Sequence, residues 1–176
     1  NVGTAVALDE ALRWGKPLYE RVVTVSGLGV KEPVNLIVRI GTPYQHLIDL
    51  AGGWKTEPGK IISGGPMMGM AISRTDVPVT KGTSGILLFP PEMARRNPEQ
   101  PCIGCAMCVD ICPVNLMPTT IAKNSAIEKW DEAEALGALD CIECGSCSFI
   151  CPASRRLLDR IRRAKSEINL LKRKGK

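Results

Sequence analysis

The sequence contains 176 residues, of which 44% are hydrophobic and 23% are charged, and its formal net charge is +5. These proportions are typical of a globular protein, and the length suffices for one medium domain or two small ones. Aromatic residues make up only 4% of the chain, which argues against a nucleic-acid partner bound by stacked aromatic side chains, and no apolar run approaches the roughly 18 residues that a transmembrane helix needs.

Residues 20–43 show the alternation of apolar and polar side chains that is typical of β-strands. In "ERVVTVSGLG" the residues Val23 and Val25 fall on one face. In "PVNLIVRIGTP" the same alternation continues with Val34, Leu36, Val38 and Ile40. The glycines and proline between Gly27 and Pro33 predict a hairpin connection between the two strands.

The next stretch, "TPYQHLIDLAGG", has the signals of a short helix. We expect Thr42 to be its N-cap, Pro43 to lie in its first turn and Gly52–Gly53 to end it. The residues expected to face the sheet are Leu47, Ile48 and Ala51. Strand, strand, helix and strand in about 45 residues predict a small β-grasp-like module over residues 1–92. This module either serves only for packing or binds a ligand or another subunit through its edge or loops.

The glycine-rich stretch "IISGGPMMGMAIS" admits two interpretations. It lacks the endings of the known phosphate-binding motifs, so the segment Gly64–Met70 is either a structural tight turn or a contact with a partner or cofactor. Its methionines are either an adaptable contact surface or core. The single histidine, His46, is expected at the surface, and no constellation of residues for acid–base or nucleophilic catalysis is found.

All eight cysteines lie in two copies of one pattern, each closed by Cys-Pro. The pattern is C-x2-C-x2-C-x3-C-P, the run known from bacterial two-cluster ferredoxins, in which the fourth cysteine of each run ligates the other cluster. It predicts two [4Fe–4S] clusters. The expected ligands of the first are Cys102, Cys105, Cys108 and Cys151. The expected ligands of the second are Cys141, Cys144, Cys147 and Cys112.

Other uses of cysteine fit this pattern less well. A zinc ion is bound by four thiolates, but zinc binding does not require the third and fourth cysteines that each run places at these spacings. Disulfides suit small secreted proteins, and cysteines three residues apart are crowded for pairing. A single degraded or three-iron cluster is the remaining alternative.

The residues inside the runs suit a cluster site. Small residues would let main-chain N–H groups approach the sulfurs; they are Gly104, Ala106, Gly145, Ser146 and Ser148. Apolar residues would form a dry wall that limits the access of solvent; they are Ile103, Val109, Ile111, Ile142, Phe149 and Ile150.

Between and after the runs the pattern is helical. "PTTIAKNSAIEKWDEAEALGALD" predicts one helix that starts near Thr119 or Thr120 and stops near Gly137. The tail carries an apolar stripe at helical spacing, formed by Leu157, Leu158, Ile161, Ala164, Ile168 and Leu171. Residues 153–176 contain ten basic and two acidic side chains. The stripe is expected to dock on the ferredoxin core, or the basic side, including Arg162 and Arg163, attracts an acidic ferredoxin, a partner subunit or anionic lipid.

Several stretches taken in order resemble the C subunit of the Rnf complex, the ion-translocating ferredoxin:NAD oxidoreductase of bacterial membranes. They are "NVGTAVALDEAL" (1–12), "VSGLGVKEPVN" (25–35), "IISGGPMMGM" (61–70), both cysteine runs and "IRRAKSEI" (161–168). The resemblance implies an α+β protein with a β-grasp-like module, a remnant of a larger nucleotide-binding half, in residues 1–92. It implies a helical dicluster ferredoxin domain with a basic C-terminal helix in residues 93–176.

The resemblance also implies a function. The intact subunit would be peripheral on the cytoplasmic face of the bacterial cell membrane, without a transmembrane segment of its own. It would pass electrons between an FMN and NAD(H) site and other subunits of the complex, with soluble ferredoxin as a further candidate partner. No glycine-rich FMN- and NADH-binding stretch occurs here and the chain starts at Asn1 rather than Met, so we expect a fragment that lacks the catalytic lobe and FMN and NAD(H) only in the intact subunit.

Two alternatives remain. Cobalamin reductases of microcompartments share the layout, although the details "GGPMMGM" and "RRAKSEI" favour the Rnf subunit. A cluster-bearing redox sensor is the other possibility, in which the clusters would report oxygen or iron.

Overall fold

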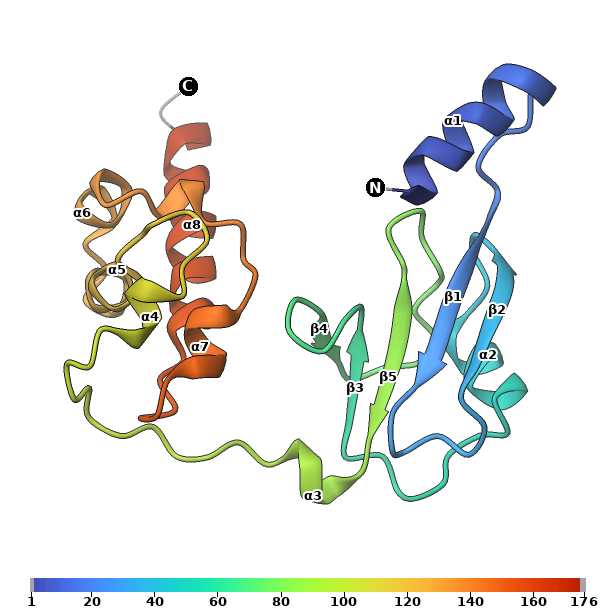
Figure 1. The fold of residues 1–176 in the computed structure, drawn as a ribbon, viewed down its shortest axis with the longest axis horizontal. Helices are drawn as coiled ribbons and strands as arrows, with labels where there is room; N and C mark the ends of the chain where they lie inside the picture. The colour runs from blue at the N-terminus through green and yellow to red at the C-terminus, as the bar shows by residue number, and fades with distance from the viewer. Residues whose placement is uncertain (1, 175–176) are drawn as a thin grey trace. The chain divides into compact units, whose positions relative to one another are not determined.

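The computed structural model describes residues 2–174 and confirms the expected α+β class. The chain divides into two compact units, Asn1–Arg95 and Arg96–Lys176. The first unit holds the β-sheet and the second is helical, as the ribbon in Figure 1 shows.

The first unit is built on a mixed five-stranded sheet in the order β2-β1-β5-β3-β4. The strands are β1 (Glu20–Ser26), β2 (Val34–Arg39), β3 (Lys60–Ser63), β4 (Met70–Ile72) and β5 (Gly85–Phe89). The first two strands form the predicted antiparallel hairpin, and β1 pairs with β5 in parallel. This arrangement, with helix α2 (Tyr44–Leu50) between the hairpin and the later strands, is β-grasp-like.

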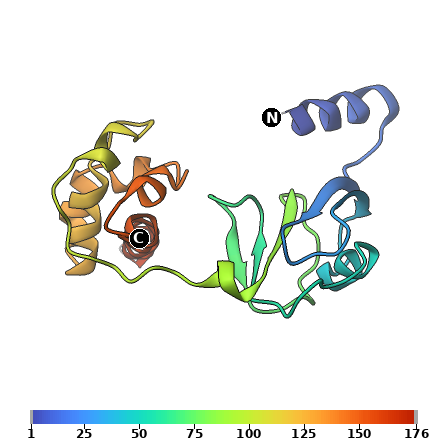
Figure 2. The same cartoon turned by 60° about the horizontal axis from the view of Figure 1, so that its bottom comes forward.

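The core of this unit lies between the sheet and α2 (Figure 2). Val23 and Val25 are fully buried, which confirms the predicted alternation in β1. The helix contributes Leu47 and Ile48, and Ala51 follows at its C-cap; each is also fully buried as expected. Burial of apolar side chains from both elements is the main force that holds them together.

The predicted start of α2 is wrong by one residue. The N-cap position belongs to Pro43, which has an extended conformation and makes no side-chain capping bond. Thr42 instead donates its hydroxyl hydrogen to the carbonyl of Arg39 at 2.8 Å, inside the preceding turn. The predicted end is confirmed, because Gly52 and Gly53 adopt φ angles of 77° and 78° directly after the helix.

The Gly64–Met70 segment is a hairpin turn between β3 and β4. Gly69 is held close to its neighbours, since a Cβ atom there would lie 2.5 Å from the carbonyl oxygen of Gly65. The methionines Met67, Met68 and Met70 are 42%, 55% and 66% exposed. The segment is therefore a turn, and the interpretation of the methionines as core is wrong; a contact of this turn with a partner or cofactor stays a prediction.

Two helices of the first unit were not expected from the sequence. Helix α1 (Val2–Trp14) has no buried residue, and α3 (Pro91–Ala94) is a single turn after β5. A helix that buries no face does not need an apolar stripe, so the sequence of such a helix lacks the periodic pattern from which a helix is predicted.

The second unit packs short helices around one long one. Its elements are α4 (Met107–Asp110), α5 (Pro118–Ala126), α6 (Trp130–Ala135), the 3₁₀ turn η1 (Ala138–Asp140), α7 (Ser146–Ile150) and α8 (Leu157–Lys174). Figure 1 shows α5 and α6 beside α8, and their contacts bury Ile121, Ala133 and Ile161. The predicted tail stripe is confirmed from Leu157 to Ile168, whereas Leu171 is 50% exposed.

The linker between the cysteine runs is two helices rather than the single helix predicted. The chain breaks between α5 and α6, where Glu128 adopts a φ of 61°. Ile127 lies in this break and is 63% exposed. The break lets Trp130 and Ala133 reach the same core as Ile121, which a straight helix would not allow. The stop at Gly137 is confirmed by its left-handed conformation.

Among residues 2–174, no helix combines the length and the apolar character that are needed to cross a membrane.

Gly27 provides a direct test of the sheet geometry. It has a φ of 109°, and a Cβ atom there would collide with the main-chain carbonyl oxygen of Leu88 on β5. We expect Gly27→Ala to lower the free energy of unfolding of this unit by about 2–4 kcal/mol, from left-handed strain and overpacking together. Urea denaturation followed by the fluorescence of Trp54, which packs against the sheet core, would measure the loss.

The matched control is Gly82→Ala, because the nearest atom to a Cβ there is the Thr80 hydroxyl at 3.9 Å, an ordinary contact. Both variants are compared in a background where Trp14 and Trp130 are phenylalanine, so that the emission reports only the first unit. Equal stability of the two glycine variants would contradict the register of β1 against β5.

Candidate iron–sulfur sites

The eight cysteines line two separate cavities in the second unit, four to each. The first cavity, of about 210 Å³, includes Cys102, Cys105, Cys108 and Cys151 in its lining. The second, of about 20 Å³, includes Cys112, Cys141, Cys144 and Cys147. Each cavity therefore has three cysteines of one run and the fourth cysteine of the other.

The local backbone explains how a run serves two cavities. In each run the loop ends in a residue with left-handed conformation, Ala106 or Gly145, and a single helical turn follows. The fourth cysteine, Cys112 or Cys151, comes after this turn and so lies away from the first three. The turns α4 and α7 pack against each other, which places the end of each run beside the loop of the other.

The donors at these cavities suit iron–sulfur clusters. All eight cysteines are free thiols, and a [4Fe–4S] cluster is held by four cysteine thiolates. Within residues 2–174, no three His, Cys, Asp or Glu side chains meet closely enough to hold a single metal ion. Each cavity has four cysteine thiols in its lining, so the donor set of each cavity fits a [4Fe–4S] cluster.

The pKa values of the thiols differ with their surroundings. The pKa of Cys102 is lowered, first by the main-chain N–H of Gly104 and then by the hydroxyl of Thr119. The pKa of Cys144 is lowered mainly by the hydroxyl of Ser146. Burial raises the pKa of Cys147 to about 11. Such a thiol is protonated near neutral pH, where it loses its proton when a metal centre takes the proton's place.

Burial also raises the pKa values of Cys108 and Cys141. The raised values occur in both sets, and the lowered values do too, so each set mixes buried thiols with thiols held near hydrogen-bond donors. Hydrogen bonds to sulfur are one determinant of the reduction potential of a cluster.

Two main-chain N–H groups that donate to cysteine sulfurs were not predicted from the sequence. The N–H of Leu116 lies 3.3 Å from the sulfur of Cys112, and the N–H of Glu143 lies 3.4 Å from that of Cys141. Small residues were the expected sites of close approach, and Gly104 and Ser146 do act in this way. Whether a main-chain N–H reaches a sulfur depends, however, on the path of the backbone. The residue type at that position therefore does not reveal the donor.

The predicted dry wall is only partly correct. Ile103 and Val109 line the first cavity and Ile142 lines the second. Ile111, Phe149 and Ile150 are not part of either lining, and Phe149 is 78% exposed. The helical turns α4 and α7 are only four and five residues long, so they have room to direct one side toward a cavity while the other side faces outward.

Helix α8 is tied to the loop of the second run by charge. Glu143 accepts hydrogen bonds from Arg162 Nε at 2.8 Å and Lys165 Nζ at 2.9 Å. Lys165 also donates to the carbonyl oxygen of Cys141 at 2.7 Å. The two cations hold the pKa of Glu143 below its usual range, with the hydrogen bond from Lys165 as the largest cause.

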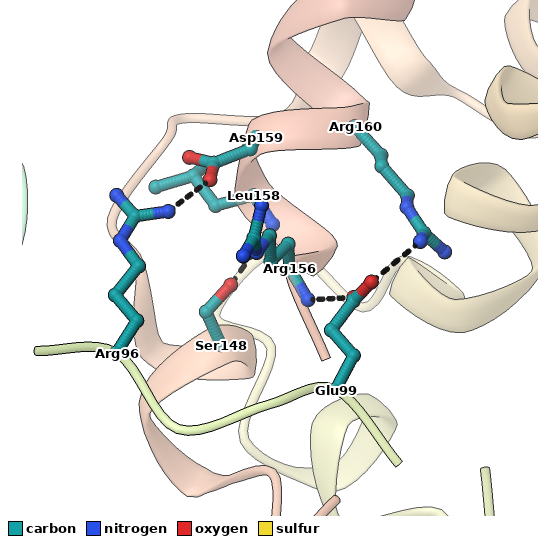
Figure 3. Close-up of polar contacts among 7 residues, drawn as sticks. All are labelled: Arg96, Glu99, Ser148, Arg156, Leu158, Asp159 and Arg160. Atoms are coloured by element: carbon teal, nitrogen blue, oxygen red, sulfur yellow. Dashed lines mark hydrogen bonds and ion pairs between the residues drawn. The ribbon is translucent and has the colours of Figure 1, made fainter. Parts of the chain in front are cut away.

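The segment before the first run is fixed to the start of α8, as Figure 3 shows. Glu99 accepts from the main-chain N–H of Arg156 at 2.7 Å and from the Arg160 guanidinium at 2.8 Å. Arg96 pairs with Asp159 at 2.8 Å. These contacts hold residues 96–100 against the helix and so position the entry to the first cysteine loop.

Two family descriptions match parts of this chain. Residues 22–71 match the SLBB domain, which covers the sheet from β1 to β4. Residues 93–168 match the 4Fe–4S dicluster domain, which contains all eight cysteines. Two [4Fe–4S] clusters are therefore the cofactors of this chain.

Relatives extend the match over almost the whole chain. The C subunit of the Na(+)-translocating ferredoxin:NAD(+) oxidoreductase complex of Acetobacterium woodii is 51% identical over 99% of this chain and 40% of the relative. The C subunit of the proton-translocating complex of Clostridium ljungdahlii is 47% identical over 95% of this chain and 37% of the relative. The C subunit of the ion-translocating oxidoreductase complex of Methanosarcina acetivorans is 42% identical over 95% of this chain and 37% of the relative.

The chain spans about two fifths of the length of these relatives. Their names give no support to the cobalamin-reductase or sensor alternatives. Together with the β-grasp-like unit and the two cysteine-lined cavities, the identities confirm the resemblance seen in the sequence: over the part that they share, this chain belongs to the C subunits of ion-translocating ferredoxin:NAD oxidoreductase complexes.

Proposed function

We propose that this chain relays single electrons through two [4Fe–4S] clusters within a membrane-bound, ion-translocating ferredoxin:NAD oxidoreductase complex. The observation that supports this most directly is the lining of the cavities, each with four thiols drawn from both runs. A bound cluster supplies one-electron chemistry. The chain's own residues supply the thiolates, the N–H donors and the apolar surroundings.

The proposed ligand sets follow the two cavities. The first cluster is assigned to Cys102, Cys105, Cys108 and Cys151. The second cluster is assigned to Cys141, Cys144, Cys147 and Cys112. Because α4 and α7 pack together and each leads to the fourth ligand of one cluster, both clusters depend on the same pair of helical turns. An electron relay benefits from this arrangement, because the relative position of the two cluster sites within the unit is fixed.

The two parts of the chain have different roles in this relay. Residues 1–92 are the β-grasp-like module, a remnant of a larger nucleotide-binding half, and residues 93–176 are the dicluster ferredoxin domain. FMN and NAD(H) are assigned to the intact subunit, and the eight cysteines of this chain serve one-electron transfer. The names of the relatives support a place beside other subunits of a redox complex; soluble ferredoxin as a partner and a peripheral position on the cytoplasmic face complete the proposal.

The names of two relatives give different coupling ions. One relative carries sodium in its name and another carries the proton, and their identities to this chain are 51% and 47%.

The first test counts the clusters. We expect the chain reconstituted without oxygen to bind about eight iron and eight sulfide, because two [4Fe–4S] clusters contain that number. The reduced protein should give the EPR spectrum of two interacting clusters, and both should be reduced and reoxidised reversibly at low potential. A chain that takes up zinc instead, or that loses its clusters on mild oxidation as a sensor would, contradicts the relay.

The second test addresses the exchange of the fourth ligands. In a Cys102→Ala, Cys105→Ala background, only the second cluster remains. Adding Cys112→Ala should then remove or degrade this cluster, because it loses one of its four thiolates, whereas adding Cys151→Ala should leave it intact. Iron content and the EPR signal of the remaining cluster are the measurements.

The background variant itself is the control for folding. If Cys151→Ala removed the remaining cluster and Cys112→Ala spared it, each run would hold its own fourth ligand and the proposed sets would be wrong.

A further inference from the structure

The two cysteine runs correspond residue by residue with a shift of 39 positions, which takes Cys102 to Cys141. The backbone follows the same correspondence. The matching pairs of left-handed residues are Gly104 and Glu143, Ala106 and Gly145, and Asn115 and Ser154. Because the two loops share their backbone conformation, differences between the cavities arise from the side chains at corresponding positions.

The largest of these differences is Arg155. It lines the first cavity, and its counterpart Leu116 lines the second. A second difference is Thr119 in the first cavity, whose counterpart Leu158 lines the second. Besides its four cysteines, the second cavity is lined by Gly, Pro and aliphatic residues alone. The first contains a guanidinium and a hydroxyl.

The guanidinium of Arg155 has an unused donor. Its Nε is buried and has no hydrogen-bond partner among the described residues. Its Nη1 makes only a long contact, 3.4 Å, to the carbonyl oxygen of Gln100. A buried N–H without an acceptor costs free energy, and an anionic cluster with its sulfur atoms is an acceptor of the right charge for this cavity.

The cations nearest the second set are engaged elsewhere. Arg162 and Lys165 both bond to the carboxylate of Glu143, which opposes their charge. Neither of them belongs to the lining of the second cavity. The second site therefore has cations in its surroundings, but they act from outside the cavity and against a neighbouring negative charge.

The two sets of cysteines also differ in their exposure to solvent. Cys102 and Cys105 are exposed, whereas Cys147 in the second set is buried. A reduced cluster carries one more negative charge than an oxidised one, so a nearby cation, hydrogen-bond donors and water all favour reduction. Hydrogen-bond donors to sulfur occur in both sets, whereas the cation in the lining and the access of water are stronger at the first cavity.

We propose that Arg155 tunes the first cluster, donating to it from Nε and raising its reduction potential above that of the second, so that an electron given to the pair rests on the first. The inference rests on the ligand sets of the proposed function. Arg155 is a positioning residue in this scheme, because it stabilises a charge state and does not ligate the metal.

The test isolates the first cluster in a Cys141→Ala, Cys144→Ala background and measures its midpoint potential by EPR-monitored titration. With Arg155→Leu, which copies the side chain at the corresponding position of the second site, we expect the ratio of reduced to oxidised cluster at a fixed potential to fall about tenfold, a lowering of about 59 mV for a one-electron couple. Arg156→Leu removes the same charge from an exposed neighbour outside the lining and should change the midpoint far less.

If Arg155→Leu fails to take up iron, Arg155→Gln decides, since it removes the charge while a polar side chain remains, and its midpoint should also be lower. An unchanged midpoint in the loaded variant would overturn the inference and leave the relay intact. So would a wild-type chain in which the second cluster is reduced first. A chain that assembles no clusters would refute the proposed function itself.

Discussion

The exchange of the fourth cysteine between the two cavities is the constraint on which the rest of the second unit depends. It requires α4 and α7 to pack together, and α4 also contacts α5 while α7 contacts α8. The sulfurs are also part of the packing: Cys147 lies in a buried cluster with Ala122 and Leu157, and Cys141 packs against the core around Ile161. Metal site and hydrophobic core are thus one structure, as is common in a small domain that cannot bury much apolar surface of its own.

The features predicted correctly from sequence were those set by local periodicity. Alternation placed Val23 and Val25 in the core, and the cysteine spacing indicated two equivalent sites. The wrong predictions concern features that are set by contacts between residues far apart in the sequence. The break at Glu128 turns α6 toward a core whose other side is supplied by α8, and no residue within the linker records that requirement. The start of α2 shifted because Thr42 found an acceptor in the preceding turn, a competition that hydroxyl side chains often enter.

The charge of the tail shows the same limit. Counted along the sequence, residues 153–176 are strongly basic, which made a surface for acidic partners one of the two predictions for the tail, beside docking of its apolar stripe. In the folded unit many of these cations meet carboxylates of the same unit, with pairs such as Arg160–Glu99 and Arg163–Glu128 joining residues far apart in the chain. The exposed pair Arg163–Glu128 contributes little stability, but both pairs reduce the positive field that the helix presents. Counting charges along one segment overestimates the positive charge of its surface whenever the carboxylates that pair with it lie elsewhere in the sequence.

Glu143 shows why the two halves cannot be treated as copies. Its φ of 59° is a conformation that glycine adopts at the corresponding position, Gly104, and a non-glycine residue there costs about 1–3 kcal/mol. Its carboxylate, two-thirds shielded from solvent, accepts from both Arg162 and Lys165, and charged hydrogen bonds contribute about 1.5–3 kcal/mol each before screening. Two such bonds offset the strain and fasten α8 to the second loop. At the first loop, Gly104 offers no side chain for such a tie, and the segment around Glu99 holds the start of α8 instead. One repeated motif is therefore anchored by two different means, and the electrostatic surroundings of the two sites differ as a consequence.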